Sequence, residues 1–240
     1  MTWFEEWFDS PYYHILYKNR DEKEACYFLD HLITKLSLAQ GGKALDLACG
    51  KGRHSVYLNK QGFEVTGVDL SEASIEHARQ FENSKLSFFV HDMRNILYVN
   101  YFDYIFNLFT SFGYFDKESE NHDVLAAAYA GLKPGGLFVI DYMNSKKVID
   151  HMLRRETKVV EGITFDMRRA LTNGFITKQI NFSDKGTDYV YHEKVRAIKH
   201  DQLVAMLQQA GFTVTHQYGD YYLNPFMENQ SDRVILVGRK

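Results

Sequence analysis

The segment from Lys43 to Ser55, with the sequence KALDLACGKGRHS, constrains the fold of this chain more than any other part. Its apolar residues predict a buried strand, which breaks at Gly50 and Gly52 and is followed by a helix. Because neither glycine has a side chain, the turn lets backbone N–H groups at the helix start approach a ligand closely. The segment therefore predicts an α/β fold with a ligand site at the end of this strand.

An acidic residue inside the strand, Asp46, indicates that the ligand of this turn is not a phosphate. A carboxylate beside the turn would repel an anion. The dinucleotide fingerprint G-x-G-x-x-G also needs a third glycine, and Ser55 stands in that place. The pattern instead favours a ligand that has a positive amino group and no phosphate.

The sequence D-L-A-C-G-K-G, Asp46 to Gly52, resembles motif I of the class I S-adenosylmethionine (SAM) methyltransferases. SAM carries an ammonium, a sulfonium and a ribose, but no phosphate. The resemblance covers roughly Leu36 to Asn144, where further strands are predicted in the family's order. Their ranges are Glu64 to Ser71 ending in Asp69, Ser87 to Met93 ending in Asp92, Phe102 to Phe115, and Leu132 to Asn144.

The resemblance implies that SAM is the cofactor and S-adenosylhomocysteine (SAH) the product. It implies that Asp46 and Gly50 contact the methionine end, while Asp92 binds the adenine amino group and Met93 packs on the ring. Asp69 lies 17 residues after Gly52, close to the offset of a carboxylate that accepts ribose hydroxyls. The full set of expected cofactor-binding residues is Asp46, Ala48, Gly50, Gly52, Asp69, Leu70, Asp92, Met93, Asn107, Tyr17 and Arg20.

The N-terminal segment from Ser10 to Ala25 is dense in aromatic and hydrogen-bonding residues. It resembles the Y-x-x-x-Y entrance of family members with an N-terminal lid, which implies that Tyr13 or Tyr17 lines the active site. Arg20 could pair with the SAM carboxylate, because a guanidinium group suits a carboxylate in a two-pronged geometry. The alternative is an aromatic-rich cap that packs only for stability.

Methyl transfer mainly requires that donor and acceptor be held close and aligned. A base is needed only if the acceptor must first lose a proton, and the sequence identifies no catalytic residue. Family members place the acceptor at the loop after the fourth strand, here Asn107 to Phe115. Many nucleic-acid N-methyltransferases have [DN]-P-P-[YF] there, and this chain lacks both prolines. The aromatic residues suit an apolar or aromatic acceptor, unless the loop only packs on the sheet. The expected substrate-binding residues are Tyr13, Phe109, Tyr114, Tyr142, Tyr221 and Tyr222.

The composition narrows the range of partners. A net charge of −3 disfavours a large phosphate-binding surface, and therefore a nucleic-acid partner. The two cysteines, Cys26 and Cys49, form no C-x-x-C pair, which predicts a reduced, cytoplasmic protein. There is no apolar run of about 18 residues, so no membrane span is expected. The ten histidines show no metal-ligand spacing, and no metal site is expected.

Alternating strands and helices predict a Rossmann-like, mostly parallel sheet, with seven strands by the resemblance and helices on both faces. Alternating apolar residues and turn signals between about Lys158 and Val195 predict three or four antiparallel strands. We therefore expect four parts. Residues 1–40 form an N-terminal lid and helix, 41–145 the SAM-binding core, 146–198 an antiparallel insertion over the active site, and 199–240 the last helix and two final strands.

The leading hypothesis is a SAM-dependent methyltransferase that acts on O or N of a small molecule. One alternative is methylation of RNA or protein, and another is a non-catalytic protein that binds SAM or SAH. A dinucleotide oxidoreductase is disfavoured by Asp46 and Ser55. The identity of the acceptor and the presence of a homodimer stay open.

Overall fold

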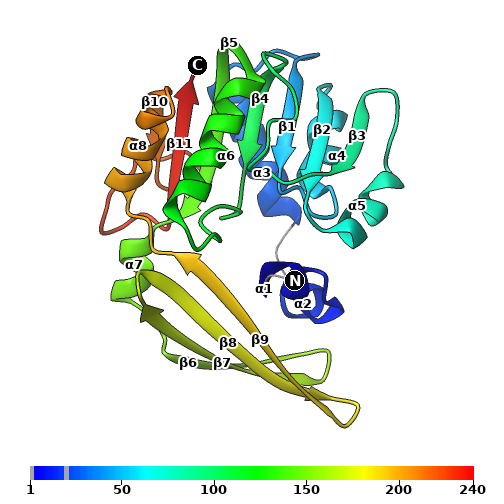
Figure 1. The fold of residues 1–240 in the computed structure, drawn as a ribbon, viewed down its shortest axis with the longest axis vertical. Helices are drawn as coiled ribbons and strands as arrows, with labels where there is room; N and C mark the ends of the chain where they lie inside the picture. The colour runs from blue at the N-terminus through cyan, green and yellow to red at the C-terminus, as the bar shows by residue number, and fades with distance from the viewer. Residues whose placement is uncertain (1–2, 19–21) are drawn as a thin grey trace.

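A seven-stranded sheet with the order β10-β11-β5-β4-β1-β2-β3 forms the centre of the protein (Figure 1). The structure is a computed structural model that describes residues 3–18 and 22–240. The strands are β1 (Lys43–Leu47), β2 (Glu64–Asp69), β3 (Leu86–Val90), β4 (Phe102–Asn107), β5 (Leu132–Met143), β10 (Thr213–Tyr218) and β11 (Arg233–Arg239). Only β11 runs against its neighbours, β5 and β10. The predicted mostly parallel, Rossmann-like sheet is confirmed.

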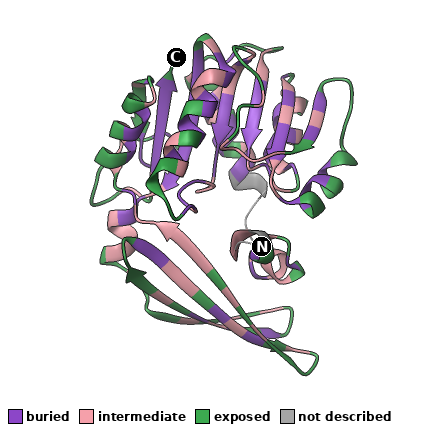
Figure 2. Cartoon of the chain, viewed as in Figure 1, coloured by how far each residue is buried: buried purple, intermediate pink, exposed green. Residues whose placement is uncertain are grey.

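Helices cover both faces of this sheet, as the sequence predicts. On one face α3 (Glu22–Lys35), α4 (Arg53–Lys60) and α5 (Glu72–Arg79) share a buried cluster with strand residues such as Val139. On the other face α6 (Glu118–Gly131) and α8 (His200–Gln209) share a second cluster with Ile140. Successive strand residues point to opposite faces, so the central strands are buried on both sides (Figure 2).

The region after β5 forms a separate antiparallel sheet, β6-β7-β8-β9, which α7 (Ser145–Asp150) connects to the core. Its strands are β6 (Arg155–Val160), β7 (Ile163–Thr172), β8 (Phe175–Asp184) and β9 (Thr187–Arg196). Each hairpin turn ends in a glycine and has two residues of positive φ, the geometry that twisted hairpins favour. The predicted antiparallel insertion is confirmed with four strands.

Two short N-terminal helices, α1 (Trp3–Phe8) and α2 (Pro11–Leu16), lie between the two sheets (Figure 1). Trp7 and Leu16 are fully buried against the inner face of the insertion sheet, in a cluster with Phe165 and Ile180. The sequence predicts a lid in this region, but not these two helices. A signal for α2 was present, because Ser10 caps its N-terminus and Pro11 follows. No helix in the described parts of the chain is long and apolar enough to cross a membrane.

Candidate functional site

A pocket of about 340 Å³ lies at the carboxyl ends of β1, β2 and β4, and residues of α1 and α2 also line it. The structure brings most of the expected cofactor-binding residues into its wall. These are Tyr17, Asp46, Ala48, Gly50, Asp69, Leu70, Asp92 and Met93. Arg20 lies outside the described residues. The carboxyl edge of a parallel sheet is where ligands of open α/β folds bind.

The two glycines of the turn have different structural tasks. At Gly50 a Cβ atom would meet nothing within 4 Å, and the residue lines the pocket. At Gly52, where φ is 83°, a Cβ atom would lie 2.7 Å from the ring of Phe88. Gly52 does not line the pocket, contrary to its place among the expected contacts. It instead allows α4 to start close to β3.

Asp69 holds the turn in place from the end of the neighbouring strand. Its carboxylate accepts the backbone N–H of Gly50 at 2.8 Å and that of Ser71 at 2.9 Å. Burial raises the pKa of Asp69 above its ordinary value, and these backbone N–H groups partly offset the increase. The carboxylate is thus fixed in orientation at the pocket wall.

Asp46 is a buried acid, with 2% of its surface exposed. The hydroxyl of Ser55 donates a hydrogen bond to it at 2.6 Å. Burial raises the pKa of Asp46 to about 7, in spite of this hydrogen bond, and the charge of Asp69 adds to the increase. A cationic ligand group in the pocket would stabilise the ionised form.

Asp92 differs from these two acids because a cation accompanies it. The guanidinium of Arg94 binds both carboxylate oxygens, with Nε at 3.0 Å from each. Burial opposes ionisation of Asp92, but Arg94 outweighs burial and holds the pKa below its ordinary value. Arg94 also bonds to Glu120 of α6. Arg94 is not among the residues predicted from the sequence, although its place two residues after Asp92 is a signal.

Besides Gly52, two more of the expected contacts, Asn107 and Tyr142, do not line either pocket. Asn107 is fully buried at the end of β4. Its amide donates to the carbonyl oxygens of Leu47 at 3.3 Å and Ser111 at 3.4 Å, so it joins β1 to the loop that follows β4. Tyr142, an expected substrate contact, is also fully buried, and its hydroxyl donates to the carbonyl of Arg196. Tyr142 therefore packs in the core on the α6 and α8 face.

A second pocket of about 940 Å³ adjoins the first, and Phe8, Tyr13, Phe109 and Tyr114 line both. All the other expected substrate contacts line this pocket: Tyr13, Phe109, Tyr114, Tyr221 and Tyr222. The charged residues of this pocket come from distant segments and were not predicted from the sequence. They are Glu193, Asp220, Asp232 and Arg233.

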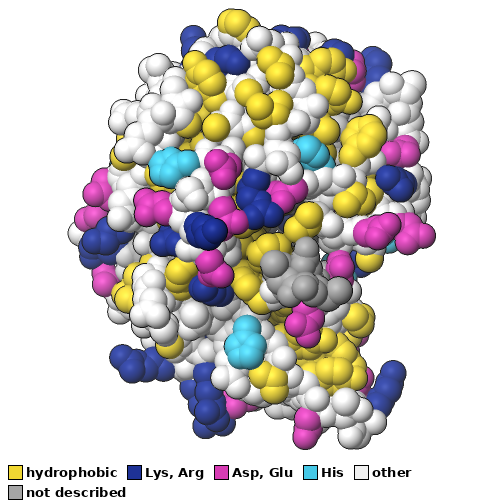
Figure 3. Space-filling model, viewed as in Figure 1, with side chains coloured by type: hydrophobic (Ala, Val, Ile, Leu, Met, Phe, Trp, Pro, Cys, Tyr) yellow, Lys and Arg dark blue, Asp and Glu magenta, His cyan; other side chains and the backbone are white. Residues whose placement is uncertain are grey.

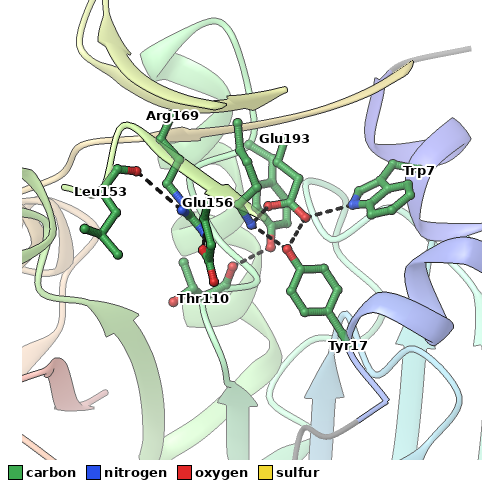
Figure 4. A network of polar contacts seen from close by, with 9 residues as sticks. Trp7, Tyr17, Thr110, Leu153, Glu156, Arg169 and Glu193 are labelled. Atoms are coloured by element: carbon green, nitrogen blue, oxygen red, sulfur yellow. Dashed lines mark hydrogen bonds and ion pairs between the residues drawn. The ribbon is translucent and has the colours of Figure 1, made fainter. Parts of the chain in front are cut away.

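Glu193 of β9 links the insertion sheet to the N-terminal helices (Figure 4). Its carboxylate accepts from Nε1 of Trp7 at 2.8 Å, the hydroxyl of Tyr17 at 2.5 Å and Nζ of Lys178 at 2.5 Å. Burial alone would raise the pKa of Glu193, but Lys178 and these hydrogen bonds keep it below its ordinary value. Glu193 is therefore ionised, and Tyr17 is held where it lines the first pocket.

His54 adds a neutral group to the first pocket. Burial, with a contribution from Arg53, lowers the pKa of His54 to about 3. Its ring stacks on Phe109 with the centroids 4.9 Å apart. Over residues 3–18 and 22–240, no group of His, Cys, Asp and Glu side chains is arranged to hold a metal ion.

Comparisons with known proteins agree with this geometry. A family model described as a methyltransferase domain matches residues 44–136. The putative methyltransferase GWCH70_2453 of Geobacillus sp. (strain WCH70) is 30% identical over 84% of this chain and 86% of its own. The glycine/sarcosine N-methyltransferase of Parasynechococcus marenigrum (strain WH8102) is 27% identical over 84% of this chain and 72% of its own.

The fold is also found among solved structures. A SAM-dependent methyltransferase from Clostridium acetobutylicum ATCC 824 superposes with a TM-score of 0.80 at 18% identity, over 95% of each chain. Two further curated relatives are matched over only 47% and 40% of their own length.

Proposed function

Because the chain belongs to the family of SAM-dependent methyltransferases, we propose that it methylates the nitrogen of a small amine. The observation that carries this proposal is the second pocket, which shares one aromatic wall with the first. Two adjoining pockets suit a donor and an acceptor that must be aligned for an in-line displacement. The glycine/sarcosine N-methyltransferase named above is a relative with an amine substrate.

The residues of the first pocket fit SAM. A buried carboxylate whose pKa is raised to about 7, Asp46, fits the ammonium of the methionine part, and Gly50 leaves room for it. We assign the ribose hydroxyls to Asp69, and the adenine to Asp92 and Met93. When bound, SAM supplies a methyl group that its sulfonium activates for transfer. The chain then has to orient the cofactor and exclude water.

The second pocket fits an amine by its combination of rings and carboxylates. Aromatic faces attract cations, and the carboxylate of Asp220 lines the same pocket as Tyr221 and Tyr222. Glu193 also lines this pocket, but its carboxylate is paired with Lys178. Arg233 also lies in this wall, but the buried carboxylate of Asp141 accepts from its Nε at 2.7 Å. These groups favour an amine in the second pocket, next to the first pocket, which we assign to the methyl donor. The aromatic side chains shield the transferred methyl group from water.

The test is SAH release from SAM across a panel of acceptors. We expect turnover with small amines, such as glycine, sarcosine and amino sugars, and none with matched hydroxyl compounds such as glycolate. Turnover only with hydroxyl compounds, RNA or protein would overturn the proposal. Micromolar SAH binding without turnover on any member of the panel would indicate a non-catalytic binding protein instead.

The partners and the division of the chain are also proposals. On the face drawn in Figure 3, lysine and arginine side chains are interspersed with acidic ones, which supports a small-molecule acceptor over a nucleic acid. We propose that residues 146–198 cover the active site from one side and residues 1–40 from the other, around the core formed by 41–145 and 199–240. A cytoplasmic location and a homodimer are further proposals.

A further inference from the structure

The loop after β4 contains two consecutive residues in a costly backbone conformation. Phe109 has a φ of 58° and Thr110 a φ of 62°, and neither is a glycine. Side chains with a Cβ atom rarely occupy this left-handed region, and such strain persists only where the surroundings hold it. The neighbouring groups that hold this loop therefore decide where the Phe109 ring lies.

Asp141 of β5 binds the backbone of both strained residues. Its side-chain Oδ2 accepts the N–H of Phe109 at 2.8 Å, and its backbone carbonyl accepts the N–H of Thr110 at 2.9 Å. Asp141 is fully buried. The sequence analysis did not identify it.

Two further side chains complete this anchor. Arg233 of β11 donates from Nε to Oδ1 of Asp141 at 2.7 Å and from Nη2 to Oγ1 of Thr110 at 2.9 Å. The hydroxyl of Tyr221 donates to Oδ2 of Asp141 at 3.2 Å. The carboxylate of Asp141 thus accepts three donors, the N–H of Phe109, Nε of Arg233 and the hydroxyl of Tyr221. A carboxylate provides enough acceptor sites for all of them.

The residue held in this way lies at the junction of the two pockets. Phe109 lines both of them, and its ring contacts His54 on the donor side and Tyr221 on the acceptor side, with centroids 4.9 and 5.1 Å away. We infer that Asp141 is a positioning residue for methyl transfer, which acts by fixing Phe109 between donor and acceptor. This inference rests on the proposed function.

The decisive variant is Asp141→Asn. An asparagine side chain offers one acceptor oxygen, and its NH2 group would face an N–H donor. If the oxygen accepts from Arg233, the N–H of Phe109 is left unpaired and the strained turn can relax. Because a misplacement of about 1 Å costs roughly 100-fold in rate, we expect kcat to fall about 100-fold. The Kd for SAH, measured by calorimetry, should change less than about threefold, since Asp46, Asp69 and Asp92 are untouched.

The matched control is Asp103→Asn. Asp103 lies at the start of β4 and also accepts a backbone N–H, from Lys43 at 2.8 Å, and a cation, Lys133 at 2.7 Å. It lines neither pocket. The same chemical change at this end of the sheet should leave kcat and the Kd for SAH unchanged. If kcat falls equally in both variants, the loss is not specific to Asp141, and the inference is overturned.

A second measurement separates positioning from general stability. In the SAH-bound protein, hydrogen exchange of the 107–115 segment should be faster in Asp141→Asn than in the wild type, with the rest of the chain unchanged. Exchange that rises uniformly, with a matching loss of SAH binding, would indicate a merely structural role and overturn the inference.

The coupling to Phe109 is tested by a double-mutant cycle on kcat, with the panel amine that the wild type methylates fastest. If Asp141 acts through the ring, Asp141→Asn should lower kcat much less in a Phe109→Leu background than in the wild type. Fully multiplicative effects would overturn the inference. Failure of the proposed function is recognised separately, because the wild type itself would then methylate no amine, while the exchange rates still decide whether Asp141 holds the loop.

Discussion

In the proposed assignment Asp46 binds the ammonium of SAH and must be ionised to do so, so the affinity for SAH should rise with pH up to about 7 and then level off. In the free protein, burial raises the pKa of this carboxyl to about 7. Below that pH a bound ligand must displace a proton from Asp46. Above it the carboxylate is already charged, and binding has no such cost.

The magnitude follows from the fraction of ionised protein. With a pKa of about 7, about nine-tenths of Asp46 is protonated at pH 6, so the apparent Kd should be roughly tenfold higher than at the plateau. At pH 7 the difference should be about twofold. Titration calorimetry with SAH between pH 5.5 and 7.5 measures this profile directly. It should also record proton release, which grows as the pH falls.

Two variants assign the profile to Asp46. Asp46→Asn should bind SAH more weakly and show no inflection, since an amide does not titrate in this range. Ser55→Ala removes the hydrogen bond that lowers the Asp46 pKa, so the inflection should move to higher pH. His14 also lines the pocket, and burial lowers its pKa, so His14→Gln is the control and should keep the wild-type profile. An inflection that survives in Asp46→Asn would refute the reasoning.

The same shift has a consequence for stability, whose sign follows from proton linkage. A carboxyl with a raised pKa binds its proton more tightly in the folded state than in the unfolded state. The contribution of Asp46 to the stability of the free protein therefore falls as pH rises from about 4 to about 7. SAH binds the ionised form, so the increase in melting temperature that it causes should grow over the upper part of this range.

Three further substitutions test the proposed roles. Asp69→Ala removes the proposed acceptor for the ribose hydroxyls and the acceptor for the N–H of Gly50. SAH binding should weaken about tenfold or more while the circular dichroism spectrum stays native, and an unchanged affinity would contradict the assignment. Tyr17→Phe removes the hydrogen bond to Glu193, so SAH should dissociate about tenfold faster in stopped-flow experiments. Trp7→Ala should weaken the packing of α1 and α2 on the insertion sheet by about 3–5 kcal/mol, seen as protease cleavage within residues 3–18 while the core stays intact.

The residues of the proposed donor pocket could be singled out from the sequence because their signals are local. Glycines in a turn and carboxylates at strand ends are read within short segments, and parallel strands bring their carboxyl ends to one edge. Asp46, Asp69 and Asp92 accordingly all line one pocket. The ion pair between Asp92 and Arg94 could not be predicted from the sequence, because Arg94 reaches the carboxylate only in the folded turn.

The acceptor half was less predictable because it depends on which face a residue occupies. Asp141 and Tyr142 are neighbours on β5 and point to opposite faces of the sheet. The aromatic residue was the expected pocket contact, but the pocket lies on the face of Asp141, while Tyr142 packs towards α6 and α8. Strand periodicity predicts that Asp141 and Tyr142 point to opposite faces, but it does not predict which of the two faces the site.

Long-range contacts also explain why Glu193 was missed, and they indicate how acceptor choice is built into the fold. Trp7, Tyr17 and Glu193 meet across 176 or more residues of sequence. The N-terminal helices and the insertion sheet share a buried cluster of their own, separate from the two clusters of the core. Substitutions in that cluster can therefore reshape the acceptor pocket without disturbing the Lys43–Ser55 segment. We expect exchanges within residues 146–198 to change the preferred amine while the Kd for SAH stays within about threefold of its wild-type value.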